Sequence, residues 1–136
     1  MKDIVSEINE AAVQFGVIVD GTQDISGMEQ ECICIRYVSE DLSIHLKFIG
    51  MYEASDTSGA SICSIIKDTL IRYNLPIENL RSQTYDGASN MSGKYNGCQA
   101  AIKRIQPLAT YVHCGAHITH LITSKAAQVS PTIRNP

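Results

Sequence analysis

Two aspartates, Asp20 and Asp86, each follow a short segment with the composition of a β-strand. Carboxylates at the ends of neighbouring strands can face each other, and two ionised acids share a site readily only when a cation separates them. Mg²⁺ suits such a pair because it prefers oxygen ligands and keeps waters for a substrate. A pair of such ions activates a water or hydroxyl and stabilises the leaving oxygen of a phosphodiester. The spacing alone favours a simpler interpretation, in which each aspartate begins a turn and caps backbone N–H groups there.

Two further patterns suggest ligand binding less strongly. Cys114, His117 and His120 lie close together, with the two histidines on one face of a predicted helix. A structural zinc site needs four ligands, usually in two separated pairs, and no second pair is evident, so a packed, hydrogen-bonded role is favoured. The segment 87–94 resembles a phosphate loop, but its glycines are one residue too far apart and Tyr95 follows the lysine. That pattern therefore predicts a sharp turn beside Asp86 and no nucleotide site.

The bulk composition is that of one globular domain. The chain has 136 residues, of which 44% are hydrophobic and 18% charged. No apolar run approaches the roughly 20 residues that cross a bilayer, so we expect an intracellular protein without a membrane partner. Five cysteines without a CxxC pair favour reduced thiols over a disulfide framework. The net charge of −3 and the scattered basic residues predict little affinity for DNA by bulk electrostatics.

The order of predicted elements indicates an α/β fold. Three strands in a row, followed by alternating helices and strands, predict a mixed sheet with helices on its faces. We expect one partial domain over residues 1–128 and a disordered tail over 129–136. The predicted helices cover residues 4–12, 58–75, 98–105 and 116–127, and the predicted strands cover 17–20, 32–38, 42–48, 81–85 and 109–112.

Four blocks of sequence resemble one family in the same order along the chain. They are V-D-G-T-Q-D-I-S at 19–26, C-I-R-Y-V at 34–38, Y-D-G-A-S-N-M-S-G at 85–93 and Y-V-H-C-G-A-H at 111–117. These blocks resemble the hAT superfamily of cut-and-paste DNA transposases, and the third block matches without a break. Similar sequences occur in host proteins descended from such elements, including the zinc finger MYM-type protein 1 group and THAP-containing relatives. The resemblance runs from about residue 15 to residue 121 and fades beyond.

The resemblance implies a ribonuclease H-like fold whose D-D-E triad binds Mg²⁺ or Mn²⁺ and cleaves DNA strands. Asp20 matches the first acid and Asp86 the second, while Asp24 lies in the same signature and is interpreted as structural, the reverse assignment being left open. Asn90 either orients the metal-bound water or holds the turn after Asp86. Cys114 and His117 match the family's Cys-x-x-His pair, which is implied to serve core integrity or DNA handling.

The family's third acid is a glutamate that follows a long insertion, and no residue of this chain lies in that context. Glu53 and Glu78 are not substitutes, and Gly21 and Gln23 replace the usual Glu and Thr of the first motif. We therefore expect the N-terminal part of a ribonuclease H-like domain, truncated before the insertion and inactive alone.

The resemblance leaves three functional hypotheses. The first is a fragment of a nuclear DNA transposase, which in full-length members binds DNA and self-associates through C-terminal segments. The second is a domesticated, non-catalytic module for protein association or transcriptional regulation, which the departures in the first motif favour. The third is a truncated product without function.

Overall fold

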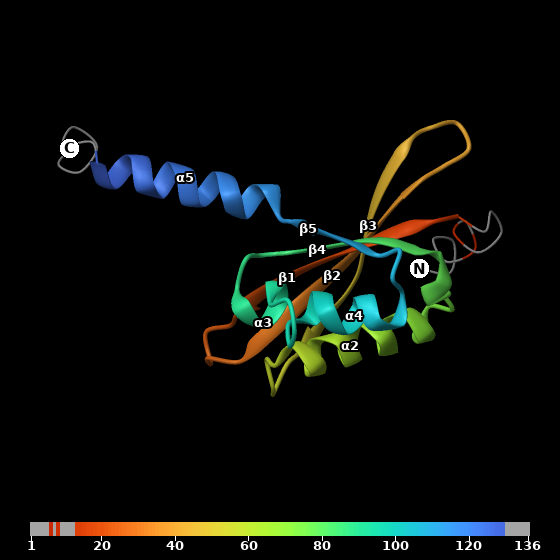
Figure 1. Cartoon of the computed structure of the whole chain (residues 1–136), viewed down its shortest axis with the longest axis horizontal. Helices are drawn as coiled ribbons and strands as arrows, with labels where there is room; N and C mark the ends of the chain where they lie inside the picture. The colour runs from red at the N-terminus through yellow and green to blue at the C-terminus, as the bar shows by residue number, and fades with distance from the viewer. Residues whose placement is uncertain (1–5, 7, 9–12, 130–136) are drawn as a thin grey trace.

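The computed structural model describes Ser6, Ile8 and residues 13–129. Five strands form one sheet in the order β3-β2-β1-β4-β5 (Figure 1). Strand β2 is antiparallel to β1 and β3, whereas β4 is parallel to β1 and β5 is parallel to β4. This mixed sheet confirms the predicted fold class. The elements are β1 (Phe15–Gln23), β2 (Glu29–Val38), β3 (Ile44–Glu53), α2 (Gly59–Arg72), η1 (Ile77–Asn79), β4 (Leu80–Tyr85), α3 (Ser89–Ser92), α4 (Cys98–Ile105), β5 (Thr110–His113) and α5 (Gly115–Val129).

One face of the sheet carries the hydrophobic core. Val17 lies opposite Ile35 and Val19 opposite Ile33 in the β1–β2 pair. Side chains directly opposite in a strand pair share a face, so these four residues point to the same side. All four are almost completely buried. Because apolar residues alternate along β1 and β2, the two strands form an apolar surface on which the helices pack.

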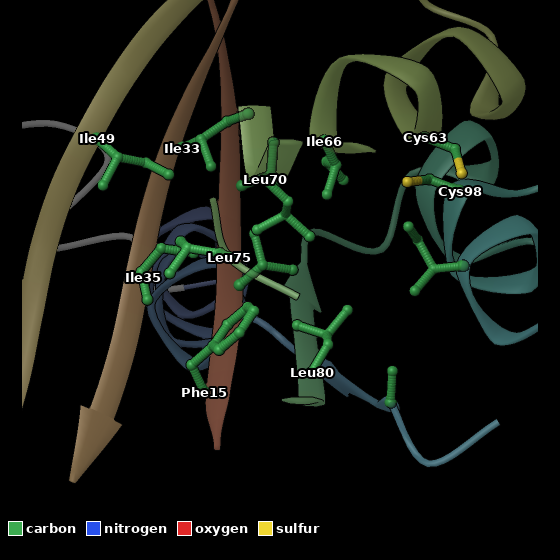
Figure 2. Packing of buried hydrophobic residues seen from close by; sticks show 14 of the residues in the cluster. Phe15, Ile33, Ile35, Ile49, Cys63, Ile66, Leu70, Leu75, Leu80 and Cys98 are labelled. Carbon is green, nitrogen blue, oxygen red and sulfur yellow. The ribbon is translucent and has the colours of Figure 1, made fainter. Parts of the chain in front are cut away.

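Helices α2 and α4 lie side by side beneath this face (Figure 1). Ser58 caps α2, because its hydroxyl accepts a hydrogen bond of 3.3 Å from the Ser61 N–H. Ile62, Ile66 and Leu70 then recur every four residues and are buried. Figure 2 shows Ile66 and Leu70 pointing toward the strands. The helical period of the sequence thus predicted the buried side of α2 correctly.

The opposite face of the sheet is exposed along β2 and β3. Val38 pairs with Ile44, and Leu46 and Phe48 follow on the same face of β3. Each of these four apolar side chains is at least 45% exposed. Among the described residues, no helix covers this part of the sheet. Helix α5 instead leaves the end of β5 and projects from the body of the domain (Figure 1).

Several strands extend beyond their predicted ends. We expected β1 to end at Asp20, but its ladder with β2 continues to the pair Gln23 and Glu29, so β2 also begins earlier than the predicted residue 32. We expected the third strand to end at residue 48, but β3 continues to Glu53. Pairing with β2 keeps both the polar end of β1 and the mainly apolar end of β3 extended.

The two ends of the chain are described only in part. Most of the predicted helix over residues 4–12 lies outside the described residues; Ser6 and Ile8 are helical, and Ile8 packs in the core. The expected tail begins at residue 129, which is the last residue of α5, and residues 130–136 lie outside the described part. Within the described residues, no helix has the length and apolarity to span a bilayer.

Candidate functional site

The parallel pair β1 and β4 positions the two aspartates that the sequence singled out. Ile18 lies in register with Thr84. The β1–β4 ladder ends at this pair; Asp20 lies two residues further along β1 and is exposed, and Asp86 is partly buried one residue beyond the end of β4. Side chains alternate along a strand, so Asp20 points to the face opposite the buried Val19 and Ile33. Both predicted acids therefore lie near the carboxyl ends of two adjacent strands.

The turn after β4 holds Asp86 in place by two hydrogen bonds. Its Oδ1 accepts a bond of 3.0 Å from the Ala88 N–H, and its carbonyl oxygen accepts one of 3.0 Å from the Tyr111 hydroxyl. Through the first bond Asp86 caps a backbone N–H of the turn, which is the role that the simpler interpretation of the sequence gave to this aspartate. The second bond ties the turn to β5, so the Asp86 backbone is anchored from two sides.

A third acid, Glu31 of β2, lies beside this pair and was missed in the sequence. Glu31 lies opposite Gly21 in the ladder, one residue beyond Asp20. Its side chain is only 4% exposed, and its Oε2 is buried without a hydrogen-bond partner in the described part of the chain. The sequence contains one sign that Glu31 is buried. In the alternation of β2, Glu31 lies on the same face as the buried Ile33 and Ile35.

The electrostatics of Glu31 show that negative charge concentrates here. Burial first, and then the charges of Asp86, Glu29 and Asp20, raise the pKa of the Glu31 carboxyl to about 7. Each of these charged neighbours is an acid, so none compensates the charge of an ionised Glu31. The carboxyl ends of β1 and β4 therefore carry uncompensated acidic groups.

A cavity of about 200 Å³ opens between these strand ends and the segments that precede α2 and α4. Asn90 spans it, since its Nδ2 donates a hydrogen bond of 2.9 Å to the Thr57 carbonyl oxygen. Of the two roles considered for Asn90, this bond fits the one in which Asn90 holds the turn after Asp86. The lining residues are Gly21, Glu29, Glu31, Thr57, Asp86, Ala88, Asn90 and Met91.

The donors at this cavity suit a divalent cation chemically. Carboxylate and amide oxygens are the ligands that Mg²⁺ and Mn²⁺ prefer. The buried Oε2 of Glu31 has a lone pair without a donor, which is the kind of group that a cation satisfies. Across residues 13–129, however, no three acid, histidine or cysteine side chains converge closely enough to form a ready-made metal site. Binding would require these side chains to draw together.

Asp24 has a different environment from Asp20. Its carboxylate accepts hydrogen bonds from the Ser26 hydroxyl at 2.6 Å, the Ser26 N–H at 2.8 Å and the Met28 N–H at 2.9 Å. These bonds, that from the Ser26 hydroxyl above all, hold the pKa of Asp24 below its ordinary value. Since its carboxylate organises the β1–β2 turn, the geometry favours Asp20 over Asp24 as the first acid.

The other acids considered in the sequence lie away from this cavity. Glu53 is exposed at the end of β3, and Glu78 is exposed in η1, at the opposite end of β4 from Asp86. Neither lines the cavity.

The cysteine and histidines at the start of α5 do not form a metal cluster within the described chain. The Cys114 N–H donates a hydrogen bond of 2.8 Å to the Tyr85 carbonyl oxygen, which joins the end of β5 to β4. The rings of His113 and His117 lie 5.9 Å apart, while His120 is exposed on α5. The packed, hydrogen-bonded role of Cys114 and His117 stays a prediction.

A known protein family matches most of this chain. Residues 1–97, which include β1 to β4 with Asp20, Glu31 and Asp86, match the family described as ZMYM1/FAM200, RNase-like domain. The chain belongs to this RNase-like domain family. The match confirms the resemblance to the zinc finger MYM-type protein 1 group.

Two curated relatives cover most of the RNase-like domain. A human protein named "52 kDa repressor of the inhibitor of the protein kinase" is 29% identical over 119 residues. The mouse protein of the same name is 27% identical over the same length. Each alignment covers 85% of this chain and 15% of the relative. The RNase-like domain described here therefore spans a small part of the length of these relatives.

Proposed function

We propose that this RNase-like domain contributes Asp20 and Asp86 to a divalent-cation site for cleaving or transferring DNA strands, within a hAT-type transposase or a protein derived from one. The observation that supports the proposal is the parallel pairing of β1 and β4, which brings the segments that carry the two aspartates close to each other. A bound Mg²⁺ or Mn²⁺ would supply an activated water and stabilise charge on a phosphodiester.

The residues around Asp86 serve to orient its carboxylate. The Ala88 N–H fixes one carboxylate oxygen, and the Tyr111 hydroxyl fixes the backbone of the same residue. Asn90 ties the turn to the segment before α2. Asp20 is presented on a paired strand, whose backbone is held by β2 and β4. Rigid elements of this kind keep ligands close to the geometry that a metal requires.

DNA contact is expected to depend on more than this domain. The net charge of −3 and the scattered basic residues offer little attraction for the phosphate backbone, so we expect a cation to mediate contact between the acids and DNA. We propose that other parts of a longer nuclear protein supply the basic surface and the family's third acid. The isolated domain is then expected to bind the cation without cleaving DNA.

A metal titration tests the proposal. Isothermal titration calorimetry with MnCl₂ is expected to show binding to the 136-residue chain, and Asp20→Asn and Asp86→Asn are expected to weaken it at least about tenfold. Asp24→Asn is the matched control, because that carboxylate is engaged in its own turn. Equal binding by the wild type and both site variants would overturn the assignment of Asp20 and Asp86.

A second candidate function is a non-catalytic regulatory module. The relatives are named repressors, and the described acids are not preassembled around an ion. Under this alternative the fold serves protein association or transcriptional regulation, and the acidic cavity binds no cation. Absence of Mn²⁺ binding up to millimolar concentrations, with the chain folded, would favour it over the first proposal.

A further inference from the structure

Glu31 interrupts the apolar face of β2 at the end where the acidic cavity lies. The next residues on that face, Ile33, Ile35 and Tyr37, are buried and belong to the core. An apolar side chain at position 31 would extend the core without penalty, whereas a buried carboxylate is unfavourable unless hydrogen bonds or a charge satisfy it. The Oε2 of Glu31 has neither among the described residues. This position therefore lacks a structural reason for a glutamate.

The Glu31 carboxylate lies against β1 directly after Asp20. A Cβ atom at position 21 would lie 3.2 Å from each carboxylate oxygen of Glu31, so the glycine there leaves the space that the carboxylate occupies. Glu31 also lines the same cavity as Asp86 and Asn90. Its oxygens thus lie on the cavity side of the sheet together with Asp86, whereas Asp20, which precedes Gly21 in β1, points to the other face and does not line the cavity.

The charges around Glu31 indicate which kind of ligand is missing. The neighbours that act on it by charge are Asp86, Glu29 and Asp20, and all of them disfavour its ionised form. A hydrogen-bond donor without charge would satisfy one oxygen but leave the repulsion between the carboxylates. A divalent cation satisfies the oxygen and offsets the repulsion together.

We propose that Glu31 is a cation ligand, which adds a carboxylate from β2 to that of Asp86 in the cavity that both residues line. The inference rests on the proposed function in that Asp86 serves the same cation. No three acids of the described chain are preassembled around an ion, so binding requires Glu31 and Asp86 to move closer together. A glutamate has three side-chain torsions, and the adjoining cavity of about 200 Å³ gives its carboxylate room to turn.

The test is MnCl₂ titration of the 136-residue chain by calorimetry, comparing the wild type with Glu31→Gln. The amide keeps the size of the side chain and removes its charge, and we expect the dissociation constant to rise at least about tenfold. Glu53→Gln makes the same change at an exposed site on β3, outside the cavity, and is expected to leave affinity within about threefold. Circular dichroism of each variant establishes that it is folded.

A second measurement requires no variant. Mn²⁺ broadens nuclear magnetic resonance signals of nearby atoms, so substoichiometric MnCl₂ is expected to broaden the signals of Glu31 and Gly21 together with those of Asp20 and Asp86. Signals of Glu53 are expected to stay sharp. Sharp Glu31 signals at a concentration that broadens those of the aspartates would overturn the inference.

The outcomes separate this inference from the proposed function. If Glu31→Gln binds Mn²⁺ like the wild type while Asp20→Asn and Asp86→Asn lose binding, Glu31 is not a ligand and the proposed site stands. If only Glu31→Gln loses binding, Glu31 holds a cation and the assignment of the aspartates fails. If the folded wild type binds no Mn²⁺, both are overturned.

Discussion

Gly21 and Glu31 face each other across β1 and β2, so close that a Cβ atom at position 21 would lie 3.2 Å from both Glu31 carboxylate oxygens. The glycine thereby allows a buried acid to lie against the strand that carries Asp20. The same pair shows why the carboxyl end of β1 differs from the rest of the core, where large apolar side chains occupy the corresponding positions.

Substitution at Gly21 is expected to act through Glu31. In the wild-type background, Gly21→Ala should lower the free energy of unfolding by about 1 kcal/mol, because the new methyl group crowds the carboxylate. In a Glu31→Ala background the same change should be neutral or stabilising by about 0.5 kcal/mol, since alanine restricts the unfolded chain more than glycine does. Urea denaturation of the wild type, the two single variants and the double variant gives the coupling free energy between positions 21 and 31. Equal effects in both backgrounds would contradict this contact.

The stability of the domain is expected to depend on pH through Glu31. Folding raises the pKa of this carboxyl from its ordinary value of 4.5 to about 7, so the folded state holds the proton more tightly than the unfolded state. The stabilisation is complete below about pH 4.5 and is lost as pH rises through about 7. The loss is at most about 3 kcal/mol.

Glu31→Gln provides the measurement of this pH effect. Urea denaturation in the presence of EDTA at pH 5 and pH 8 should show that the variant lacks the Glu31-dependent decline and is more stable than the wild type at pH 8. Glu53→Gln should retain the wild-type slope, because that side chain is exposed. Parallel pH profiles for the wild type and Glu31→Gln would show that Glu31 does not titrate in this range.

A buried polar network centred on Gln83 is expected to contribute strongly to stability. The Tyr85 hydroxyl donates to the Gln83 side-chain oxygen at 2.9 Å, and the Gln83 amide donates to the carbonyl oxygens of Ala109 at 2.9 Å and Gln99 at 3.1 Å. Gln83→Leu leaves several buried groups without partners and should lower the free energy of unfolding by about 2–4 kcal/mol. Tyr85→Phe removes one bond and should lower it by about 1–2 kcal/mol.

Chemical denaturation of the two single variants and the double variant checks this network. The double variant should be less destabilised than the sum of the single ones, because both changes disrupt the same hydrogen bond. Tyr95→Phe is the control, since that ring is exposed, and it should change stability by less than about 0.5 kcal/mol. Additive effects would mean that Gln83 and Tyr85 act independently.

Gly59 is expected to tolerate no side chain. A Cβ atom there would overlap the Asn96 carbonyl oxygen and lie 2.6 Å from the Cys98 backbone nitrogen. Because backbone atoms cannot move aside as a flexible side chain can, Gly59→Ala should cost about 3 kcal/mol despite the higher helix propensity of alanine. Gly115, the first residue of α5, has no atom within 4 Å of its Cβ position. Gly115→Ala should therefore be neutral or slightly stabilising, and thermal unfolding compares the two.

Periodicity predicted the main elements because each depends on local patterns. The alternation in β2 and the four-residue repeat in α2 both point their apolar side chains to one side. The predicted ends of β1 and β3 were wrong for different reasons. The polar residues at the end of β1 resemble a turn, whereas in β3 the strict alternation stops at Phe48, where Ile49 and Gly50 follow. Pairing with β2, which lies elsewhere in the chain, keeps both ends extended.

The candidate site was predictable only in part. Asp20 and Asp86 follow apolar segments, so an acid near each strand end could be identified from the sequence. Glu31 continues the inward phase of the β2 alternation, but it lies in a polar run with Glu29 and Gln30, which is typical of an exposed segment. Its burial also depends on Gly21 in the paired strand and on the loop after β4, which is distant in the chain. The local pattern alone does not contain that information.

The parallel contact between β1 and β4 has a kinetic consequence. Strands β2 and β3 and helix α2 all lie between Ile18 and Thr84 in the chain, so this contact closes a long loop. Long-range parallel pairing forms slowly, since the entropy of loop closure is lost before the contact is gained. The β1–β2–β3 meander needs only short connections and is expected to form first during refolding. The turn that carries Asp86 is then expected to reach the end of β1 only in the last steps, so partly folded chains should lack the acidic cavity.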